Sequence, residues 1–420
     1  MRRLPLSSDT LWLVGICAAR LGSSSSYLAY AGVLPLLQAE WGMSATAAGS
    51  ISSAFLFGFA ISLVVLSALA DRVGARRIFL WATAATAVTT AFIPLFARSY
   101  LSGLLLFTLL ALVNGGTYTP GIMLVADRFP PERRGNAIGW FLAAASLGYA
   151  VSLALTGLLV SVVGWRGAFW ALTLGPLMAT VVSVLTLRGA REGTVASGFG
   201  SLSLAEGFFK NRAALLMMTG YTFHSWEVLG MWAWTPAFLT AALALQGREL
   251  VGATGLGAGL SAIFHVMGLV ATGAGGRLSD RWGRTTVILT MLAISGLCSF
   301  TFGWLVTAPL LVLLVVGVIY AFSAIGDSPV FSTGFTEVVD ARILGSALAV
   351  RSLAGIGAGA LATLAFGRVL DLTNPPGSAP RYPVWGWAFS VLGVGALLGW
   401  VATAWLRSLP ESRRMAAGKR

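Results

Sequence analysis

The sequence predicts an all-α membrane protein with twelve transmembrane helices, built as two parallel six-helix repeats. Three observations support this fold class: the composition, the length of the apolar stretches, and a charged loop that occurs twice. Of the 420 residues, 57% are hydrophobic and 10% are charged, whereas a soluble protein carries about a quarter charged residues. Apolar stretches longer than about 18 residues recur along the whole chain, which is the signal of membrane spans.

Charges and turn residues divide the apolar sequence into twelve expected spans. The first six are 10–37, 45–70, 77–97, 99–127, 136–162 and 166–188, and the second six are 212–244, 250–277, 285–306, 308–336, 344–371 and 384–407. Each is long enough to cross a hydrocarbon core of about 30 Å as a helix and too long for a barrel strand. We therefore expect a first six-helix half at 1–188, a linker at 189–211, and a second half at 212–420 that ends in a short tail.

A charged loop begins at Asp71 and returns at Asp280, 209 residues later. Pro120 and Pro329 are also 209 residues apart. A nearly fixed offset of about half the chain indicates that one structural unit occurs twice. Two such halves with the same orientation are parallel repeats, and a solute site is expected between them near the bilayer midplane.

The distribution of Lys and Arg predicts the orientation. With the N-terminus inside, 21 of the 28 cationic side chains fall in inside segments and five fall outside. This asymmetry places both termini in the cytoplasm and the protein in the cytoplasmic membrane, with the lipid bilayer as its surroundings. It also explains the net charge of +13 without a nucleic-acid partner. The two cysteines, Cys17 and Cys298, lie in apolar runs and indicate neither a disulfide framework nor a metal site.

The charged loop carries a recognisable motif, Gly-x-Leu-x-Asp-Arg-x-Gly-Arg. The second copy has Gly276, Leu278, Asp280, Arg281, Gly283 and Arg284. The first copy has Ser67, Leu69, Asp71, Arg72 and Gly74, with Ala75 where the motif has Arg and Arg76 next. With this motif in both halves, the chain resembles the major facilitator superfamily of secondary transporters. The resemblance covers essentially the whole chain and implies transport by alternating access, with no cofactor and no enzymatic activity.

The same resemblance implies a gate at the inner ends of the helices when the protein opens outward. Asp71 would meet the helix that starts near Gly345, and Asp280 the helix that starts near Gly135, each as a carboxylate on a helix N-terminus. Loop arginines would pair with acids at the inner ends of spans four and ten. The implied pairs are Arg76 with Asp127, where Ala75 departs from the motif, and Arg284 with Glu337. The alternative is a loop that only orients the protein.

Ionisable residues inside spans are costly and mark functional sites by default. Arg20 lies about 15 Å into span one and shares a helical stripe with Ser24 and Tyr27. A guanidinium with neighbouring hydroxyls suits a carboxylate or another planar oxyanion. Pairing with a membrane acid is the alternative for Arg20. Further candidate substrate-binding residues are Asn114 and Tyr118 on span four, and Tyr221, Ser225 and Trp232 on span seven.

Two more groups are candidates for proton coupling or for ion pairs. Glu227 follows His224 by three residues on span seven, so the two side chains can hydrogen-bond, and a buried Glu can take up a proton near neutral pH. A structural contact is the alternative for this pair. Asp327 and Arg351 lie at similar depths on spans ten and eleven, and the favoured interpretation is a structural ion pair. The alternative is a functional switch, in which a proton or the solute breaks that ion pair.

We therefore expect a monomeric, proton-coupled symporter of a small organic or inorganic anion. Efflux of drug-like or apolar metabolites is the first alternative, favoured by the aromatic residues of span seven. The span-four Arg and the span-five Gly-Pro motif of drug/proton antiporters are absent, since Asn114-Gly115-Gly116 has no Arg and no Pro lies between Gly148 and Gly157. A non-transporting membrane sensor with the same fold is the alternative from another class.

Overall fold

The structure is a computed structural model that describes residues 8–188, 207–340, 342–375 and 383–419. The first half contains α1 (Ser8–Ser24), α2 (Ala29–Glu40), α3 (Ala45–Val73), α4 (Ala75–Phe96), α5 (Tyr100–Asn114), α6 (Thr119–Arg128) and α7 (Pro131–Thr186). The second half contains α9 (Arg212–Leu245), α10 (Leu250–Trp282), α11 (Arg284–Phe302), α12 (Leu310–Gly326), α13 (Ser328–Val338), α14 (Leu344–Thr373) and α15 (Gly386–Ser408). Short 3-10 helices lie at Gly115–Thr117, Gly303–Leu305 and Pro410–Gly418. The described residues contain no strand.

These helices form the twelve predicted spans. Ten segments of the described chain are long and apolar enough to cross a membrane. One of them, α7, continues through a kink at Gly164 and contains spans five and six. Span one is divided into α1 and α2 by a turn between Ser24 and Ala29, and each piece alone is too short to cross. The prediction of a twelve-helix, two-repeat fold is therefore confirmed.

Spans four and ten are interrupted near their middles, at equivalent places in the two halves. In span four, α5 gives way to the 3-10 turn and α6 begins just before Pro120. In span ten, α12 ends at Gly326 and α13 begins just before Pro329. A proline is tolerated in the first turn of a helix but not in its interior, so each Pro permits a new start there. The interruptions leave Tyr118 and Asp327 at helix ends inside the bundle.

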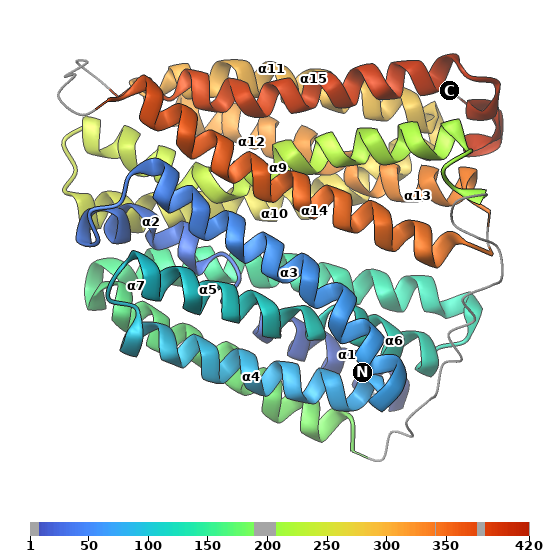
Figure 1. The fold of residues 1–420 in the computed structure, drawn as a ribbon, viewed down its shortest axis with the longest axis horizontal. Coiled ribbons are helices and arrows are strands. Elements are labelled where there is room, and N and C mark those ends of the chain that lie inside the picture. Colours follow the sequence, from blue (N-terminus) through green and yellow to red (C-terminus); the bar gives the residue numbers. More distant parts are fainter. Residues whose placement is uncertain (1–7, 189–206, 341, 376–382, 420) are drawn as a thin grey trace, which may run out of the picture.

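Both termini of the described chain lie at one end of the bundle (Figure 1). The two motif loops also lie there, between α3 and α4 and between α10 and α11. Gly74 and Gly283 form these loops with φ of 99° and 93°, a conformation that residues with a Cβ rarely adopt. We call this the basic end, because it carries Arg72, Arg76 and Arg281, and the opposite end the distal end.

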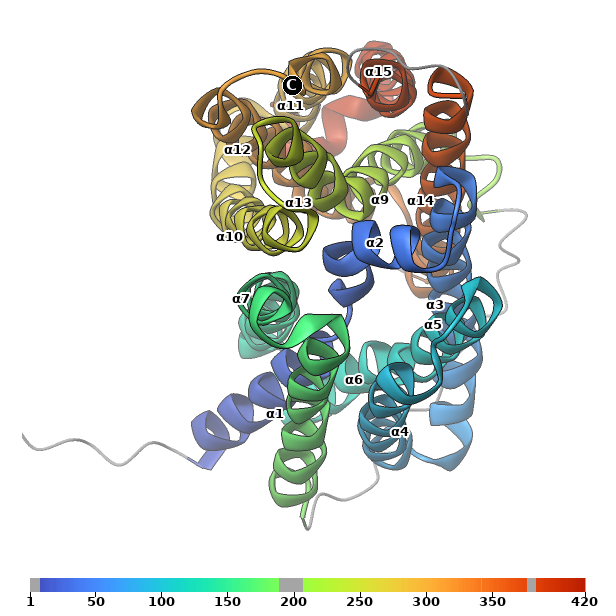
Figure 2. The ribbon, with the colours of Figure 1, turned by 90° about the vertical axis from the view of Figure 1, so that its left-hand side faces the viewer.

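The two halves are in close contact at the distal end. Figure 2, viewed from that end, shows α7 facing α10 on one side and α3 facing α14 on the other, with α2 between the halves. The α7–α10 contact is backbone to backbone, since a Cβ added to Gly157 would lie 2.6 Å from the Gly255 carbonyl oxygen. On the other side, Asp371 of α14 accepts hydrogen bonds from the backbone N–H groups of Ala45 and Thr46, at 2.8 and 2.7 Å.

The division into halves at 188 and 212 stays a prediction. The helix α7 ends at Thr186 and α9 begins at Arg212, close to the predicted limits. Of the predicted linker 189–211, the part up to 206 lies outside the described residues.

Candidate functional site

A cavity of about 500 Å³ lies between the two halves. Its closed tip is at Trp232 and His265, and it extends along the bundle to Thr333, which is exposed toward the basic end. The first half contributes Tyr118 and four residues of α7: Leu142, Ala145, Ser146 and Tyr149. The polar lining of the second half consists of Tyr221, His224, Trp232, His265, Thr272, Ser328, Ser332, Thr333, Arg351 and Ser352. The volume lies within the range of small-molecule sites.

Arg351 is the cationic group of this cavity. Its residue is 6% exposed, and its guanidinium lies over the rings of Tyr221 and Phe335, with centroids 4.2 and 5.1 Å from Cζ. Its Nε and one terminal nitrogen are buried without a hydrogen-bond partner. Among the described residues Arg351 has no carboxylate partner, so the predicted ion pair with Asp327 is wrong. A buried, underused guanidinium facing a cavity is a suitable group for an anion.

Asp327 instead faces His224. The Asp327 Oδ1 atom lies 2.8 Å from His224 Nδ1, and the two side chains are 0% and 4% exposed. Asp327 reaches this position because it lies in the break between α12 and α13, whereas His224 projects from the middle of α9. His224 also lines the cavity, so the carboxyl–imidazole pair adjoins any bound solute.

Glu227 points away from the cavity and into the second half. It accepts hydrogen bonds from Ser295 at 2.9 Å and Ser299 at 2.7 Å, both on α11, and Tyr320 of α12 contacts Ser299. Its residue is fully buried. The predicted contact with His224 is therefore wrong, because both groups have other partners on other helices.

The span-one stripe lies behind the cavity wall. Arg20 is 1% exposed, donates a hydrogen bond to Thr117, and lies over the rings of Tyr118 and Phe141, with centroids 5.3 and 5.8 Å from Cζ. Tyr118 lines the cavity and separates Arg20 from it. Among described residues Arg20 has no acidic partner either, so the alternative that pairs it with a membrane acid is not seen.

Three of the eight predicted substrate-binding residues line the cavity: Tyr118, Tyr221 and Trp232. The other five lie elsewhere. Asn114 donates to the Ser23 carbonyl, Ser24 packs near Gly148, and Ser225 packs near Gly355. Tyr27 packs edge-on against Phe55 and lines a separate pocket of about 40 Å³ that also contacts Ser52 and Trp232.

Sequence reasoning missed several lining residues. Tyr149 and Ser146 are polar groups three residues apart on an apolar span, which is the signal that could have placed them on one cavity-facing stripe. His265 of α10 also lines the cavity, and nothing in the sequence predicts its position beside Trp232, where the ring centroids are 4.9 Å apart.

The structure assembles part of the predicted gate. Arg284 bonds to Glu337 at 2.9 Å and also contacts Asp280. In the first copy, Asp127 forms no ion pair with Arg76 within the described ranges, and the buried Arg76 Nε has no partner, so that predicted pair is absent here. Among the described residues, neither Asp71 nor Asp280 accepts a hydrogen bond from the start of α14 or α7. Arg72 is exposed, and Arg281 and Gly283 lie in the second loop. The cavity opens at this same basic end. The predicted gate contacts are expected in the other state, in which the basic end is closed and the protein opens outward.

Two six-helix halves around a polar cavity are the architecture typical of a secondary transporter. The family model of the Major Facilitator Superfamily matches residues 13–363, so this chain belongs to that superfamily. It is a multi-pass membrane protein that transports small solutes, and its family and structural neighbours are transporters, not enzymes.

Individual relatives match between about half and nearly all of the chain. A probable transporter of Streptomyces coelicolor is 27% identical over 404 residues, 93% of this chain and 86% of its own. A probable L-galactonate transporter of Escherichia coli K12 is 28% identical over 267 residues, 56% of this chain and 54% of its own. Among solved structures, a bacterial homolog of the human lysosomal transporter Spinster, inward-facing and unoccupied, has a TM-score of 0.76 at 17% identity, with 99% of each chain covered. That likeness concerns the fold alone.

Proposed function

We propose that this protein is a monomeric symporter that carries a small organic anion together with a proton across the cytoplasmic membrane. Both termini face the cytoplasm in this proposal, and the cavity opens to the cytoplasm. The observation that carries the proposal is Arg351, a buried guanidinium that lines the cavity and has two nitrogens without partners.

An isolated charge inside a membrane protein is costly, and this cost favours an anionic solute. Arg351 is the eighth residue of the 30-residue helix α14. An Arg inside a span is unfavourable, by about 2.5–3.5 kcal/mol at the span centre and by less toward its ends, so a guanidinium buried there without a carboxylate partner needs a compensating interaction. Tyr221 and Phe335 supply only ring faces. A carboxylate in the cavity would pair with the free edge of the guanidinium through charge-assisted hydrogen bonds. The bound solute would then offset part of the cost of burying the Arg351 charge.

The proton site that best fits this arrangement is the pair of His224 and Asp327. The two groups share one short contact and adjoin the cavity. Protonation of this pair adds one positive charge beside Arg351, and its loss removes that charge. Binding of an anion and binding of a proton therefore favour each other by ordinary linkage.

The name of the L-galactonate transporter supports a carboxylate as the transported group. One feature favours efflux of drug-like or apolar metabolites as a second candidate. Four aromatic side chains line the cavity, Tyr118, Tyr149, Tyr221 and Trp232, and they would pack against flat apolar molecules. The experiment below separates the two candidates.

The test is a thermal-shift screen of the purified protein in detergent, at pH 5.5 and pH 7.5, with small carboxylates including L-galactonate and with drug-like cations. A ligand present at 100 times its dissociation constant adds about 2.7 kcal/mol of apparent stability. We expect carboxylates to stabilise the wild type, to stabilise Arg351→Lys only weakly, and not to stabilise Arg351→Gln. Lys keeps the positive charge but lacks the two parallel N–H donors of the guanidinium. Arg342→Gln is the matched control, because Arg342 is exposed and pairs with Asp340 in a loop.

Other outcomes would move the site or the substrate. Loss of binding in Arg20→Ala with binding kept in Arg351→Gln would place the anion at Arg20. Stabilisation only by apolar cations, independent of both arginines, would contradict the anion proposal and favour efflux.

Coupling is tested on protein reconstituted into liposomes with an imposed pH gradient. We expect Asp327→Asn to retain exchange of solute across the membrane and to lose accumulation driven by the gradient. If Glu227→Gln, and not Asp327→Asn, shows that pattern, the coupling proton resides on Glu227 and the assignment to the His224–Asp327 pair is wrong.

A further inference from the structure

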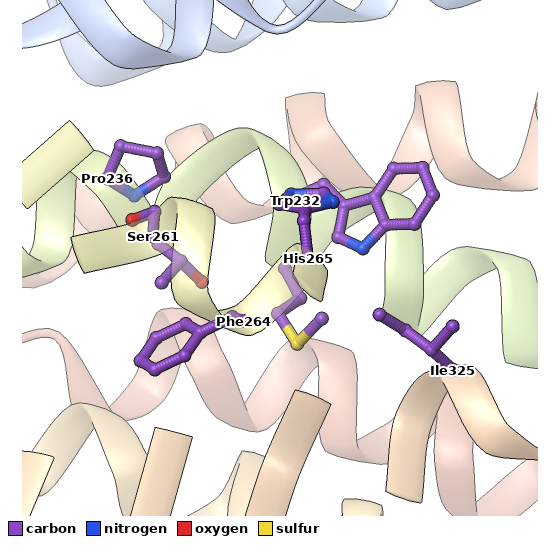
Figure 3. Close-up of a pocket in the computed structure, with 8 residues that line it drawn as sticks. Trp232, Pro236, Ser261, Phe264, His265 and Ile325 are labelled. Carbon is purple, nitrogen blue, oxygen red and sulfur yellow. The ribbon is translucent and has the colours of Figure 1, made fainter. Parts of the chain in front are cut away.

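The closed tip of the cavity continues into a small pocket of about 10 Å³. Figure 3 shows Trp232 and His265 side by side in this pocket, with Pro236 and Ser261 on one side of them and Ile325 on the other. Trp232, His265 and Ile325 also line the large cavity, so the pocket is its continuation. The volume is near the lower limit for a single water molecule, so only one small group can fit there.

Two polar groups of this pocket have no partner in the protein. The Trp232 indole N–H and the Thr235 hydroxyl are both buried without a hydrogen bond. The other Trp of α9 with a comparable burial, Trp226, donates its N–H to the Val391 carbonyl at 2.9 Å. A buried donor left unsatisfied is unfavourable, so such groups in a native structure call for a water or a ligand.

The backbone adds an acceptor at the same turn of α9. Pro236 has no N–H, so the carbonyl of Trp232, four residues earlier, lacks its ordinary helical donor. The pocket therefore combines an N–H donor, a hydroxyl that both donates and accepts, and a carbonyl acceptor. Met231, Phe264 and Ile325 form apolar walls, and the other polar residues of the lining are His265 and Ser261, whose hydroxyl donates to the Gly257 carbonyl at 2.8 Å. With no Lys or Arg among its lining residues, it does not suit a second carboxylate.

We infer that this tip is a hydroxyl-binding subsite, and that the transported solute is a hydroxy acid. The solute's carboxylate lies at Arg351 and a hydroxyl on its far part occupies the space between Trp232 and Thr235. A hydroxyl matches the pocket because it is about the size of water and both donates and accepts. This inference rests on the proposed function for the carboxylate end and adds the chemistry of the other end.

The probes are ω-hydroxy acids of four to eight carbons and the unsubstituted acids of the same lengths, with affinities measured on the purified full chain. For at least one length we expect the hydroxy acid to bind wild type about tenfold more tightly, the size of one buried hydrogen bond. In Trp232→Phe, which keeps an aromatic ring and removes the N–H, the ratio should fall to about twofold or less. Trp226→Phe is the matched control and should keep the wild-type ratio, because its N–H bonds within the protein.

Thr235→Val, which is nearly the same size as Thr, provides a second variant if Trp232→Phe does not fold. Equal binding of both acid series to wild type, with both lost in Arg351→Gln, would overturn the hydroxyl subsite and leave the anion proposal standing. In that case the pocket holds only water. If no acid of either series binds wild type, the proposed function fails and the hydroxyl subsite fails with it.

Discussion

Asp371 joins the two halves at the distal end, and its replacement by Asn tests how firmly that end is closed. The carboxylate accepts hydrogen bonds from the backbone N–H groups of Ala45 and Thr46, at 2.8 and 2.7 Å, and from the Thr46 hydroxyl. These donors belong to the first turn of α3 in the other half. An opening of the distal end separates α14 from α3 and breaks all three bonds. Asp371→Asn should therefore favour the distally open state.

The magnitude follows from the groups involved. Hydrogen bonds to a charged acceptor contribute about 1.5–3 kcal/mol, and a negative charge at a helix N-terminus contributes about 0.3–1 kcal/mol. Asn retains one carbonyl oxygen and the same shape, and Asp371 is only half-buried, so the low end of this range applies. We expect a shift of about 1.5–2 kcal/mol, which is about a ten- to thirty-fold change in the ratio of the two states.

The assay is alkylation of a cysteine behind the distal contact. Ser52 is 8% exposed and lines the 40 Å³ pocket near Tyr27. With Cys17 and Cys298 replaced by Ser, Ser52→Cys should react with a membrane-impermeant maleimide about tenfold faster when Asp371→Asn is added. Asp340→Asn is the control, because that carboxylate is in an exposed loop near the basic end. An unchanged rate in Asp371→Asn, or an equal increase in the control, would refute the conclusion that Asp371 holds the distal end closed.

Two further predictions concern ion pairs at the two ends of the bundle. A double-mutant cycle of Arg284→Gln and Glu337→Gln, measured by unfolding in detergent, should give a coupling free energy of about 1–2 kcal/mol. This value lies between those of exposed and of buried ion pairs. A coupling free energy near zero would contradict a structural role for the pair. At the distal end, burial alone would raise the pKa of Glu40, but hydrogen bonds from Trp165 and Arg166 hold this pKa below its usual range. Its contribution to stability, at most about 1 kcal/mol because the pair is exposed, should be present at neutral pH and lost as the pH falls through the lowered pKa; an effect of Glu40→Gln that is the same at every pH would exclude this origin.

The fold could be predicted because its signals are local. Span length depends on runs of apolar residues, and the repeat depends on the spacing of loops such as those at Gly74 and Gly283. Both signals are read along the chain without knowledge of which helices touch. The contact of Arg284 with Glu337, which the resemblance to the superfamily implies, is present in the structure.

The site could be predicted only in part, because depth along a helix does not fix the direction of a side chain. The stripe of Arg20, Ser24 and Tyr27 assumed one continuous helix, whereas α1 ends at Ser24 and a turn precedes α2. The predicted pairing of Asp327 with Arg351 rested on their similar depths in successive spans. Asp327 lies in a helix break that directs it to His224 instead, and no periodicity in the sequence reports such a rotation.

The two halves contribute unequally to the cavity wall. Most of its polar groups come from the second half, whereas the first half supplies Tyr118 and a short face of α7 that includes Ser146 and Tyr149. In the proposed function, a solute held by Arg351 stays with the second half while the first half moves relative to it. Substitutions in the second half should then change how tightly a solute is held, and substitutions on the α7 face should change how fast it is released. The two repeats would then have different tasks in the proposed cycle: the second half would hold the solute, and the first half would control its release.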